Sequence, residues 1–501
     1  MRRCRSHAPR LTQPRPESRV GPPDTGLPTQ GFRLNTGQPT PTAPLQDATG
    51  RTGDSTFSRA VDSPLVRGGL AISAGLITGN LIGFFRVALT AYLLGTHSAA
   101  DALAVAVGPI DTLNSVLINT MIFAFVPMLT ERDGAARAAL FRKLNRVFVR
   151  VFLLLAVAMM LFAPWLIRLL APGLDANYVG TAVTILRIAS LSSLAAGTAA
   201  LHAAFLFTHR RFAPTAFHQA SLNVFTIVAA LSLWRVIGVF GFAIGYTVGA
   251  WVQLGIVYFA ARASLRLETA PEPEVHWRDL LTKPGSFLLY AVLLALNVIV
   301  TRAYATHAGP GMAAALDYSM RCLNVPLAYL VNPVSNSLLP EIARLRSRFQ
   351  LRRAFRLIDK TIALVALTAV ASCAVGIALR EPVIRLMFER GSFTAQSTHL
   401  VSAVFLGFAP SLIGWSLLEL TSRALFALDR PWLPLRAVAI PVIFNLAFVL
   451  LVRKPEPQWI GVGASLGFLI AFLLLFTLMR VTRRRWLEQP ERDSRPALKT
   501  T

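Results

Sequence analysis

Long apolar segments alternate with short polar connections from residue 69 to residue 480. Each segment has about 20 residues or more, which is enough for a helix to cross ~30 Å of hydrocarbon. The pattern therefore predicts an all-α membrane protein of about twelve transmembrane helices. Pro109, Pro127, Pro326 and Pro333 are expected to bend or end the second and eighth of them. The predicted spans are 69–94, 101–130, 147–171, 179–207, 214–234, 238–262, 285–305, 312–339, 358–379, 397–427, 433–452 and 459–480.

The two ends of the chain lack this pattern. Residues 1–66 are rich in Pro, Thr, Gly and Arg and have almost no apolar periodicity, so they cannot bury enough surface to fold. They also lack the apolar stretch of a signal peptide. We interpret them as a disordered cytoplasmic tail or as the product of an overlong start, and residues 483–501 as a second cytoplasmic tail.

An internal repeat divides the apolar region. Arg86 and Asp101 recur 216 residues later as Arg302 and Asp317, and Asn223 has a counterpart in Asn445. The segment IRLL at 167–170 likewise returns as IRLM at 384–387. Six spans fall in each half, and an even number gives both halves the same orientation. The repeat predicts parallel halves at 67–270 and 271–482 that enclose a central, substrate-binding cavity near the middle of the membrane.

Composition supports the membrane assignment. The chain is 54% apolar and only 15% charged, against about 25% charged in an average soluble domain. Its net charge of +25 does not indicate nucleic-acid binding, because the Lys and Arg residues of the connections are concentrated in alternate ones and no nucleic-acid motif accompanies them. The exception is the connection 380–396, where Arg380, Arg385 and Arg390 are offset by Glu381 and Glu389. By the positive-inside rule, these connections and both termini face the cytoplasm of a bacterial inner membrane. The basic connections are 131–146, 208–213, 263–284, 340–357 and 428–432, with their flanking turns.

No catalytic or cofactor motif is apparent. The chain contains no HExxH, no P-loop, no Gly-rich dinucleotide turn and no recognisable nucleophile triad. Its three cysteines have neither metal-ligand nor disulfide spacing. We therefore expect a protein that is not an enzyme and that needs no cofactor or metal.

Charged side chains inside the apolar spans are the candidate functional residues. Each costs ~2.5–3.5 kcal/mol on insertion scales, so it usually faces a cavity or a partner. Arg86, Arg302 and Arg321 lie on matching helices of the two halves, and a cleft lined by arginine would bind a phosphate or diphosphate. Arg302 lies near the end of its helix and could equally reach out to the membrane surface. The full set is Arg86, Asp101, Asp111, Arg187, Arg302, Asp317 and Arg321.

Three of the candidates, Asp101, Asp317 and Asn114, have a structural alternative. Asp101 and Asp317 start helices after short loops, where a carboxylate commonly caps a helix or interacts with its dipole, and we give that role more weight than substrate contact. Asn114 belongs to a group of amides on the second and eighth spans. Such amides either join neighbouring helices or contact the hydroxyls of a sugar in a hydrated cavity.

Several stretches resemble one known family. In the first half these are NLIGFFRVALTAYLLGTHSAADALAVAVGPIDTL and AFVPMLTER, and in the second half SLLPEIARL, EPVIRLMFERGSFTAQST and RALFALDRPWLP. They are similar to the MurJ (MviN) family of the multidrug/oligosaccharidyl-lipid/polysaccharide exporter superfamily. The resemblance covers residues 69–480, and FERGSFTA is its most specific motif.

The resemblance implies two six-helix halves around a cationic cavity that opens alternately to each side. It implies a flippase for a polyprenyl-pyrophosphate-linked glycan in the bilayer, with other cell-envelope glycan biosynthesis proteins as further partners. Arg86 and Arg321 match arginines of the family's cavity, and Asp101 matches an aspartate after its first outer loop. The sequence departs from the family at Asn80 and Asn114, where the family has arginines, and at Met320, where it has an aspartate. The substrate could accordingly be lipid II or an exopolysaccharide repeat unit.

Other functions remain open from the residues alone. A multidrug or cation exporter of the same superfamily is expected to have carboxylates in the cleft for cation or proton coupling, whereas arginines prevail here. A membrane glycan polymerase or ligase is expected to have a large outer loop with acceptor-binding residues, whereas the predicted outer loops are short. A scaffold without transport activity would need neither the duplication nor the buried charges.

Overall fold

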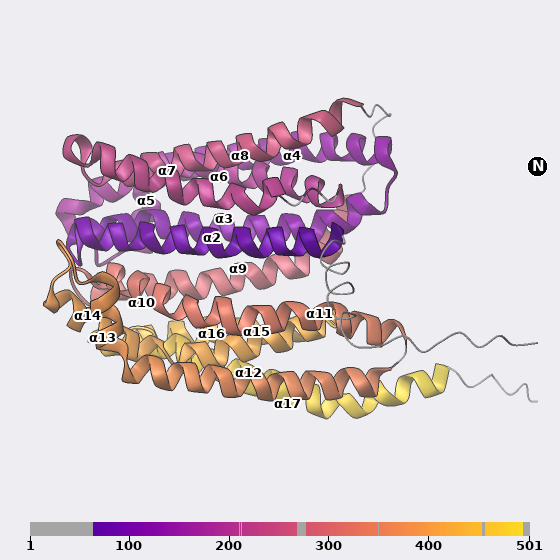
Figure 1. Ribbon diagram of the computed structural model, residues 1–501. Helices are drawn as coiled ribbons and strands as arrows, with labels where there is room; N and C mark the ends of the chain where they lie inside the picture. Colours follow the sequence, from indigo (N-terminus) through magenta and orange to yellow (C-terminus); the bar gives the residue numbers. More distant parts are fainter. Residues whose placement is uncertain are drawn as a thin grey trace, which may run out of the picture. The chain divides into compact units, whose positions relative to one another are not determined.

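The computed structural model describes residues 64–209, 211, 213–267, 277–348, 350–452 and 456–493. Almost all of the predicted tail at 1–66 lies outside these residues, and so does the predicted boundary between the halves at residue 270. All regular elements of the described residues are helical, which confirms the predicted fold class. Figure 1 shows the helices of the first half, in indigo to magenta, beside those of the second half, in salmon to yellow.

The first half contains six long helices and one short one. Their order follows the predicted spans, with the short helix α5 placed directly after α4. The helices are α2 (Pro64–Leu94), α3 (Ser98–Thr130), α4 (Gly134–Leu161), α5 (Ala163–Leu170), α6 (Ala176–Thr208), α7 (Ala213–Ile237) and α8 (Phe240–Leu267).

The second half repeats this order but breaks two of its spans. The counterparts of α3 and α6 are each divided into two α-helices, so the second half is the less regular one. Its elements are α9 (Trp277–His307), α10 (Met312–Pro326), the π-helix η1 (Leu327–Val331), α11 (Asn332–Ser347), α12 (Leu351–Ala378), α13 (Arg380–Phe388), α14 (Ala395–Phe408), α15 (Ser411–Ala427), α16 (Trp432–Leu451), the 3₁₀ turn η2 (Pro457–Trp459) and α17 (Val462–Asp493).

The described residues contain ten helices that are long and apolar enough to cross a membrane, and α14 with α15 forms an eleventh span with a 44° bend. The predicted span 312–339 is helical but divided into pieces of 15, 5 and 16 residues. Pro326 ends α10 and Pro333 lies in the first turn of α11. Proline lacks the N–H that a continuous helix needs, which explains this break. Pro109 and Pro127 do not end the second span, because α3 continues through both of them from Ser98 to Thr130.

Several helices extend past the predicted spans. α4 begins at Gly134, where Arg137 donates hydrogen bonds to the carbonyls of Leu129 and Arg132 and so stabilises the α3–α4 turn. α17 continues to Asp493, and Arg483 in this extension forms an ion pair with Asp359 of α12 at 2.8 Å. Hydropathy locates the part of a helix that lies in lipid, and these arginine-bearing turns continue the helix beyond it.

The short helices α5 and α13 carry the IRLL and IRLM repeat. Ile167 and Ile384 occupy the same place in it, and both side chains are buried in one apolar core. The two halves therefore use the repeated segment in the same way.

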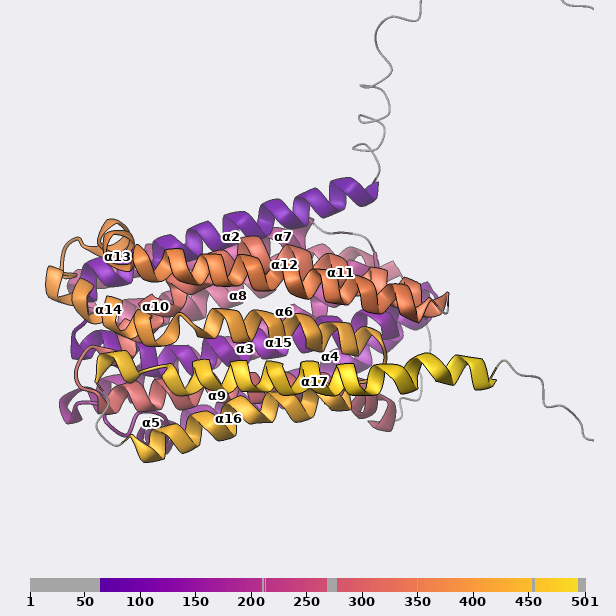
Figure 2. The ribbon, with the colours of Figure 1, turned by 90° about the horizontal axis from the view of Figure 1, so that it is seen from below.

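Hydrogen bonds join the two halves at one end of the bundle. The Tyr318 hydroxyl donates to the Gly95 carbonyl (2.9 Å), the Ser392 amide donates to the Tyr92 carbonyl (2.8 Å), and the hydroxyls of Thr96 and Ser397 lie 2.7 Å apart. We call residues 92–101, 306–318 and 391–397 the closed end. α2 begins and α17 ends at the opposite, arginine-rich end (Figure 2).

Candidate functional site

A cavity of about 210 Å³ lies between α2 and α3 of the first half and α9 and α10 of the second. Its lining includes the three predicted arginines, Arg86 from α2, Arg302 from α9 and Arg321 from α10. Asp111 and Asp317 are the acidic residues of the lining, so three positive charges face two negative ones. The repeat thus brings its arginines to one shared, cationic space.

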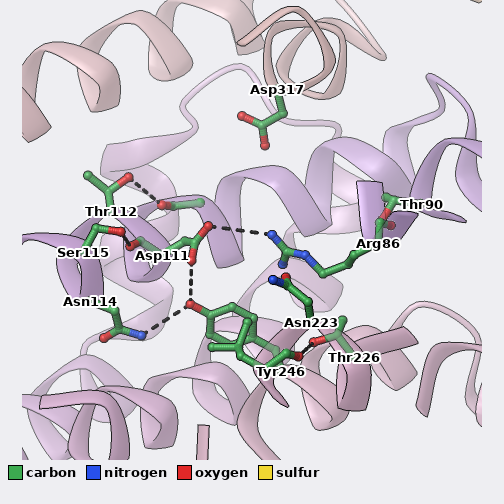
Figure 3. A network of polar contacts seen from close by, with 12 residues as sticks. Arg86, Thr90, Asp111, Thr112, Asn114, Ser115, Asn223, Thr226, Tyr246 and Asp317 are labelled. Atoms are coloured by element: carbon green, nitrogen blue, oxygen red, sulfur yellow. Dashed lines mark hydrogen bonds and ion pairs between the residues drawn. The ribbon is translucent and has the colours of Figure 1, made fainter. Parts of the chain in front are cut away.

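Arg86 is part of a polar network in the first half (Figure 3). Its guanidinium lies 3.8 Å from the Asp111 carboxylate and 5.9 Å from the centre of the Tyr246 ring. The Tyr246 hydroxyl donates to Asp111 at 2.9 Å, and Asn114 donates to the same hydroxyl at 3.4 Å. These contacts orient the Arg86 side chain, because Asp111 of α3 and Tyr246 of α8 both hold its guanidinium within the first half.

Arg302 is buried and does not extend to the membrane surface. Its Nη2 donates to Asp317 at 2.5 Å, while its Nε and Nη1 atoms have no partner among the described residues. The guanidinium lies against Gly108 of α3, where a Cβ atom would overlap it. A glycine at this position is what lets an arginine of the second half reach the first.

Arg321 differs from the other two arginines. No hydrogen bond or ion pair joins it to the described residues, and it borders both the first cavity and a second one. An arginine without an internal carboxylate partner is free to bind an external anion, and its planar donors suit a phosphate bidentately.

The second cavity, of about 230 Å³, lies in the first half. It shares Arg86, Asp111 and Arg321 with the first cavity, so the two cavities are neighbours. Amide side chains dominate the rest of its polar lining. They are Asn80, Asn114, Asn223 and Gln253.

Asp101 lies away from this space, at the closed end. Its carboxylate accepts hydrogen bonds from the backbone amides of Gly311 (2.5 Å) and Ala314 (2.8 Å), at the start of α10. It borders a separate cavity of about 110 Å³. The predicted interaction with a helix terminus is therefore present, but the helix is one of the other half.

The sequence interpretation did not single out Tyr246 and Gln253. Their only signal was a tyrosine and a glutamine inside the apolar span 238–262, and such residues are common in membrane helices. Arg187, which the sequence suggested as a buried charge, is exposed on α6 and donates to the Met160 carbonyl at 3.4 Å. Of the described residues, no group of three or more His, Cys, Asp or Glu side chains could hold a metal ion.

Comparisons with solved structures show how widely the fold occurs. The chain superposes on a structure described as "Lipid II flippase MurJ, inward closed conformation" with a TM-score of 0.72 and 21% identity, covering 82% of this chain and 87% of that one. It superposes on an inward-facing multidrug resistance MATE family transporter of the MOP superfamily with a TM-score of 0.68 and 14% identity, covering 81% and 96%. At these identities the likeness shows the fold alone.

Sequence comparisons narrow the assignment. The chain is 27% identical to a probable lipid II flippase MurJ of Rhizobium meliloti, over 84% of this chain and 82% of that protein. It is 25% identical to the lipid II flippase MurJ of Burkholderia cenocepacia, over 85% of each. The family model described as "Lipid II flippase MurJ" matches residues 90–497. The chain therefore belongs to the MurJ family, a family of membrane transporters rather than of enzymes.

Proposed function

We propose that the chain moves a lipid II-type substrate, a glycan linked through diphosphate to a polyprenyl chain, from the cytoplasmic to the outer leaflet of the inner membrane. The main support is the cavity in which Arg86, Arg302 and Arg321 meet between the two halves. A diphosphate is the part of such a lipid that arginines bind best, since each guanidinium offers parallel N–H donors to phosphate oxygens. The names of the related proteins point to the same substrate.

The transport cycle is alternating access. The arginine-rich end faces the cytoplasm by the positive-inside rule, which puts both termini there and the closed end at the outer surface. The diphosphate and glycan enter from the cytoplasm and pair with Arg86 and Arg321, while the polyprenyl chain stays in lipid. The hydrogen bonds of the closed end then break, and the halves close at the arginine-rich end.

A second candidate substrate is an exopolysaccharide repeat unit on the same lipid carrier. It is favoured by Asn80, Asn114 and Met320, which stand where the family has charged residues. A multidrug exporter, by contrast, binds cations, and the excess of arginine over aspartate in the cavity disfavours them.

The test is translocation by the purified chain in proteoliposomes. Arg86→Ala and Arg321→Ala should each lower the initial rate about a hundredfold, because removing a buried charged partner costs about 2–5 kcal/mol. Arg187→Ala is the matched control, since it removes a membrane-embedded arginine that faces away from the cavity, and its rate should stay at the wild-type level.

Full rates in both cavity variants would contradict the assignment. Comparing a lipid-linked disaccharide-pentapeptide with a lipid-linked oligosaccharide that lacks the peptide separates the two candidate substrates. Transport of the second lipid alone would favour the exopolysaccharide unit.

A further inference from the structure

The second cavity borders the proposed diphosphate site at Arg86 and Arg321, but its amide side chains have no role in that site's contacts with the diphosphate. Asn114 and Gln253 are both almost completely buried there, with 3% and 2% of their surface exposed. Neither the Oδ1 atom of Asn114 nor the Oε1 atom of Gln253 has a hydrogen-bond partner among the described residues. Buried polar atoms without partners are costly and uncommon, so two of them beside one cavity call for an explanation.

The corresponding amides of the second half give a contrast. Asn445, the repeat counterpart of Asn223, donates to Asn297 Oδ1 (2.7 Å) and to Thr301 Oγ1 (2.9 Å). Asn223 makes one longer bond, to the Gly79 carbonyl at 3.3 Å. The amides of the second half thus bond to one another, whereas those of the first half keep capacity to bind something else.

The position of the cavity limits what that ligand can be. A group attached to a diphosphate held by Arg86 and Arg321 must lie next to them, and the second cavity borders both. The ligand cannot extend toward the closed end, because the hydrogen bonds of Asp101 to the start of α10 join the two halves there. Together the two cavities fall within the ~300–1,000 Å³ typical of small-molecule sites.

The chemistry of the lining favours a neutral, hydroxyl-rich ligand. Amide groups both donate and accept hydrogen bonds, as do sugar hydroxyls. Apart from Arg86, Asp111 and Arg321 at the border with the first cavity, the lining carries no charged residue. An acidic or basic peptide would find no partner deeper in this space.

We propose that this second cavity is a sugar subsite, in which Asn114 and Gln253 bind the first sugar attached to the diphosphate. The inference rests on the proposed function and deepens it, because it assigns the glycan to the first half of the protein. The diphosphate is held between the halves, while the sugar is recognised by α3 and α8.

The experiment measures binding of two lipids to the purified full chain in nanodiscs. The probes are undecaprenyl diphosphate and undecaprenyl-diphospho-N-acetylglucosamine. The variants are Asn114→Leu and Gln253→Met, which keep the side-chain volume and remove the hydrogen-bonding groups. Gln458→Met is the control, because Gln458 is an exposed amide remote from both cavities.

Each cavity variant should bind the glycosylated lipid about tenfold more weakly or worse, since a ligand hydroxyl loses its buried partner. Binding of undecaprenyl diphosphate should stay within about twofold of the wild type for Gln253→Met and for the control. Asn114→Leu also removes a hydrogen bond to the Tyr246 hydroxyl in the network around Arg86, so it can weaken both lipids, but it should weaken the glycosylated one more. The control should match the wild type for both lipids.

An equal loss for the two lipids would overturn the subsite and assign the amides a structural role. Unchanged binding of the glycosylated lipid would overturn it as well. A wild-type chain that binds neither lipid would overturn the proposed function itself, and the subsite with it.

Discussion

The arginines of the cavity have unequal surroundings. The Arg302 side chain is 7% exposed and its one ion pair is with Asp317. The Arg86 side chain is 14% exposed, and its partner Asp111 is about half exposed. Because a buried charge without its partner is far more costly than a hydrated one, the two aspartates should differ in their contribution to stability.

We expect Asp317→Asn to lower the free energy of unfolding by about 3–5 kcal/mol, because it leaves Arg302 as an uncompensated buried charge. Asp111→Asn should cost about 1 kcal/mol, since water reaches that pair. Thermal unfolding of the detergent-purified variants measures both. The double variant Arg302→Met with Asp317→Leu should regain most of the loss, and equal effects of the two single variants would refute the ranking.

At this scale the sequence predicted which arginines line the cavity, but not how they are paired. Hydropathy identifies Arg86, Arg302 and Arg321 because charges are rare in apolar spans. It gives no information on Asp317 as the partner of Arg302, since the helix rotations that bring them together depend on packing. Gly108 has a role that sequence alone could not reveal, because the residue it accommodates lies on α9.

The second-half counterparts of α3 and α6 are each broken into two helices, whereas α3 and α6 are continuous. The α14–α15 bend takes backbone groups out of the helical ladder, and side-chain hydroxyls commonly replace such bonds in membranes. The Ser465 hydroxyl of α17 donates to the Gly407 carbonyl at this bend, at 3.0 Å. The bend is therefore supported by a neighbouring helix.

Ser465→Ala should lower the free energy of unfolding by about 1 kcal/mol, because it leaves a buried carbonyl without that donor. Ser416→Ala is a control of the same chemistry, since the buried Ser416 hydroxyl has no partner among the described residues, and its effect should stay within about 0.5 kcal/mol. Denaturant unfolding followed by tryptophan fluorescence measures both. A larger loss in the Ser416 variant would contradict this account of the bend.

The elements themselves were largely predictable. Apolar length located the spans, and prolines marked the break between α10 and α11. Hydropathy could not separate α5 from α4, because a short break inside an apolar stretch leaves the average unchanged. The predicted span 358–379 did end with α12, but α13 at 380–388 fell in a predicted connection, because its charged residues lower its hydropathy. Hydropathy could not find the 44° bend at 409–410 either, since the span 397–427 reads as one apolar stretch.

For the whole molecule, the contacts of the closed end hold the two halves together. Asp101 is central among them, because its carboxylate binds two backbone amides at the start of α10 across the interface. The carboxyl group of Asp101 also lies at the positive end of that helix dipole. In the proposed transport cycle, outward opening requires these bonds to break.

Asp101→Ala should therefore loosen the closed end. We expect the amides of Gly311 and Ala314 to exchange hydrogen about tenfold faster, which corresponds to ~1.4 kcal/mol and matches the loss of charge-assisted hydrogen bonds. Hydrogen-exchange mass spectrometry of the peptide around residues 308–316 gives the readout. Asp175→Ala is the control, because Asp175 caps α6 within its own half. Unchanged exchange in the Asp101 variant would contradict the role of Asp101 in holding the two halves together.

The excess of three arginines over two aspartates in the cavity has an electrical consequence. An inside-negative voltage is worth ~2.3 kcal/mol per elementary charge per 100 mV. In the proposed transport cycle, the empty carrier, with one surplus positive charge, is drawn toward the cytoplasm-facing state. The proposed substrate, a diphosphate diester with a negative charge on each phosphate, would reverse the sign, so the same voltage would push the loaded carrier outward and reset the empty one.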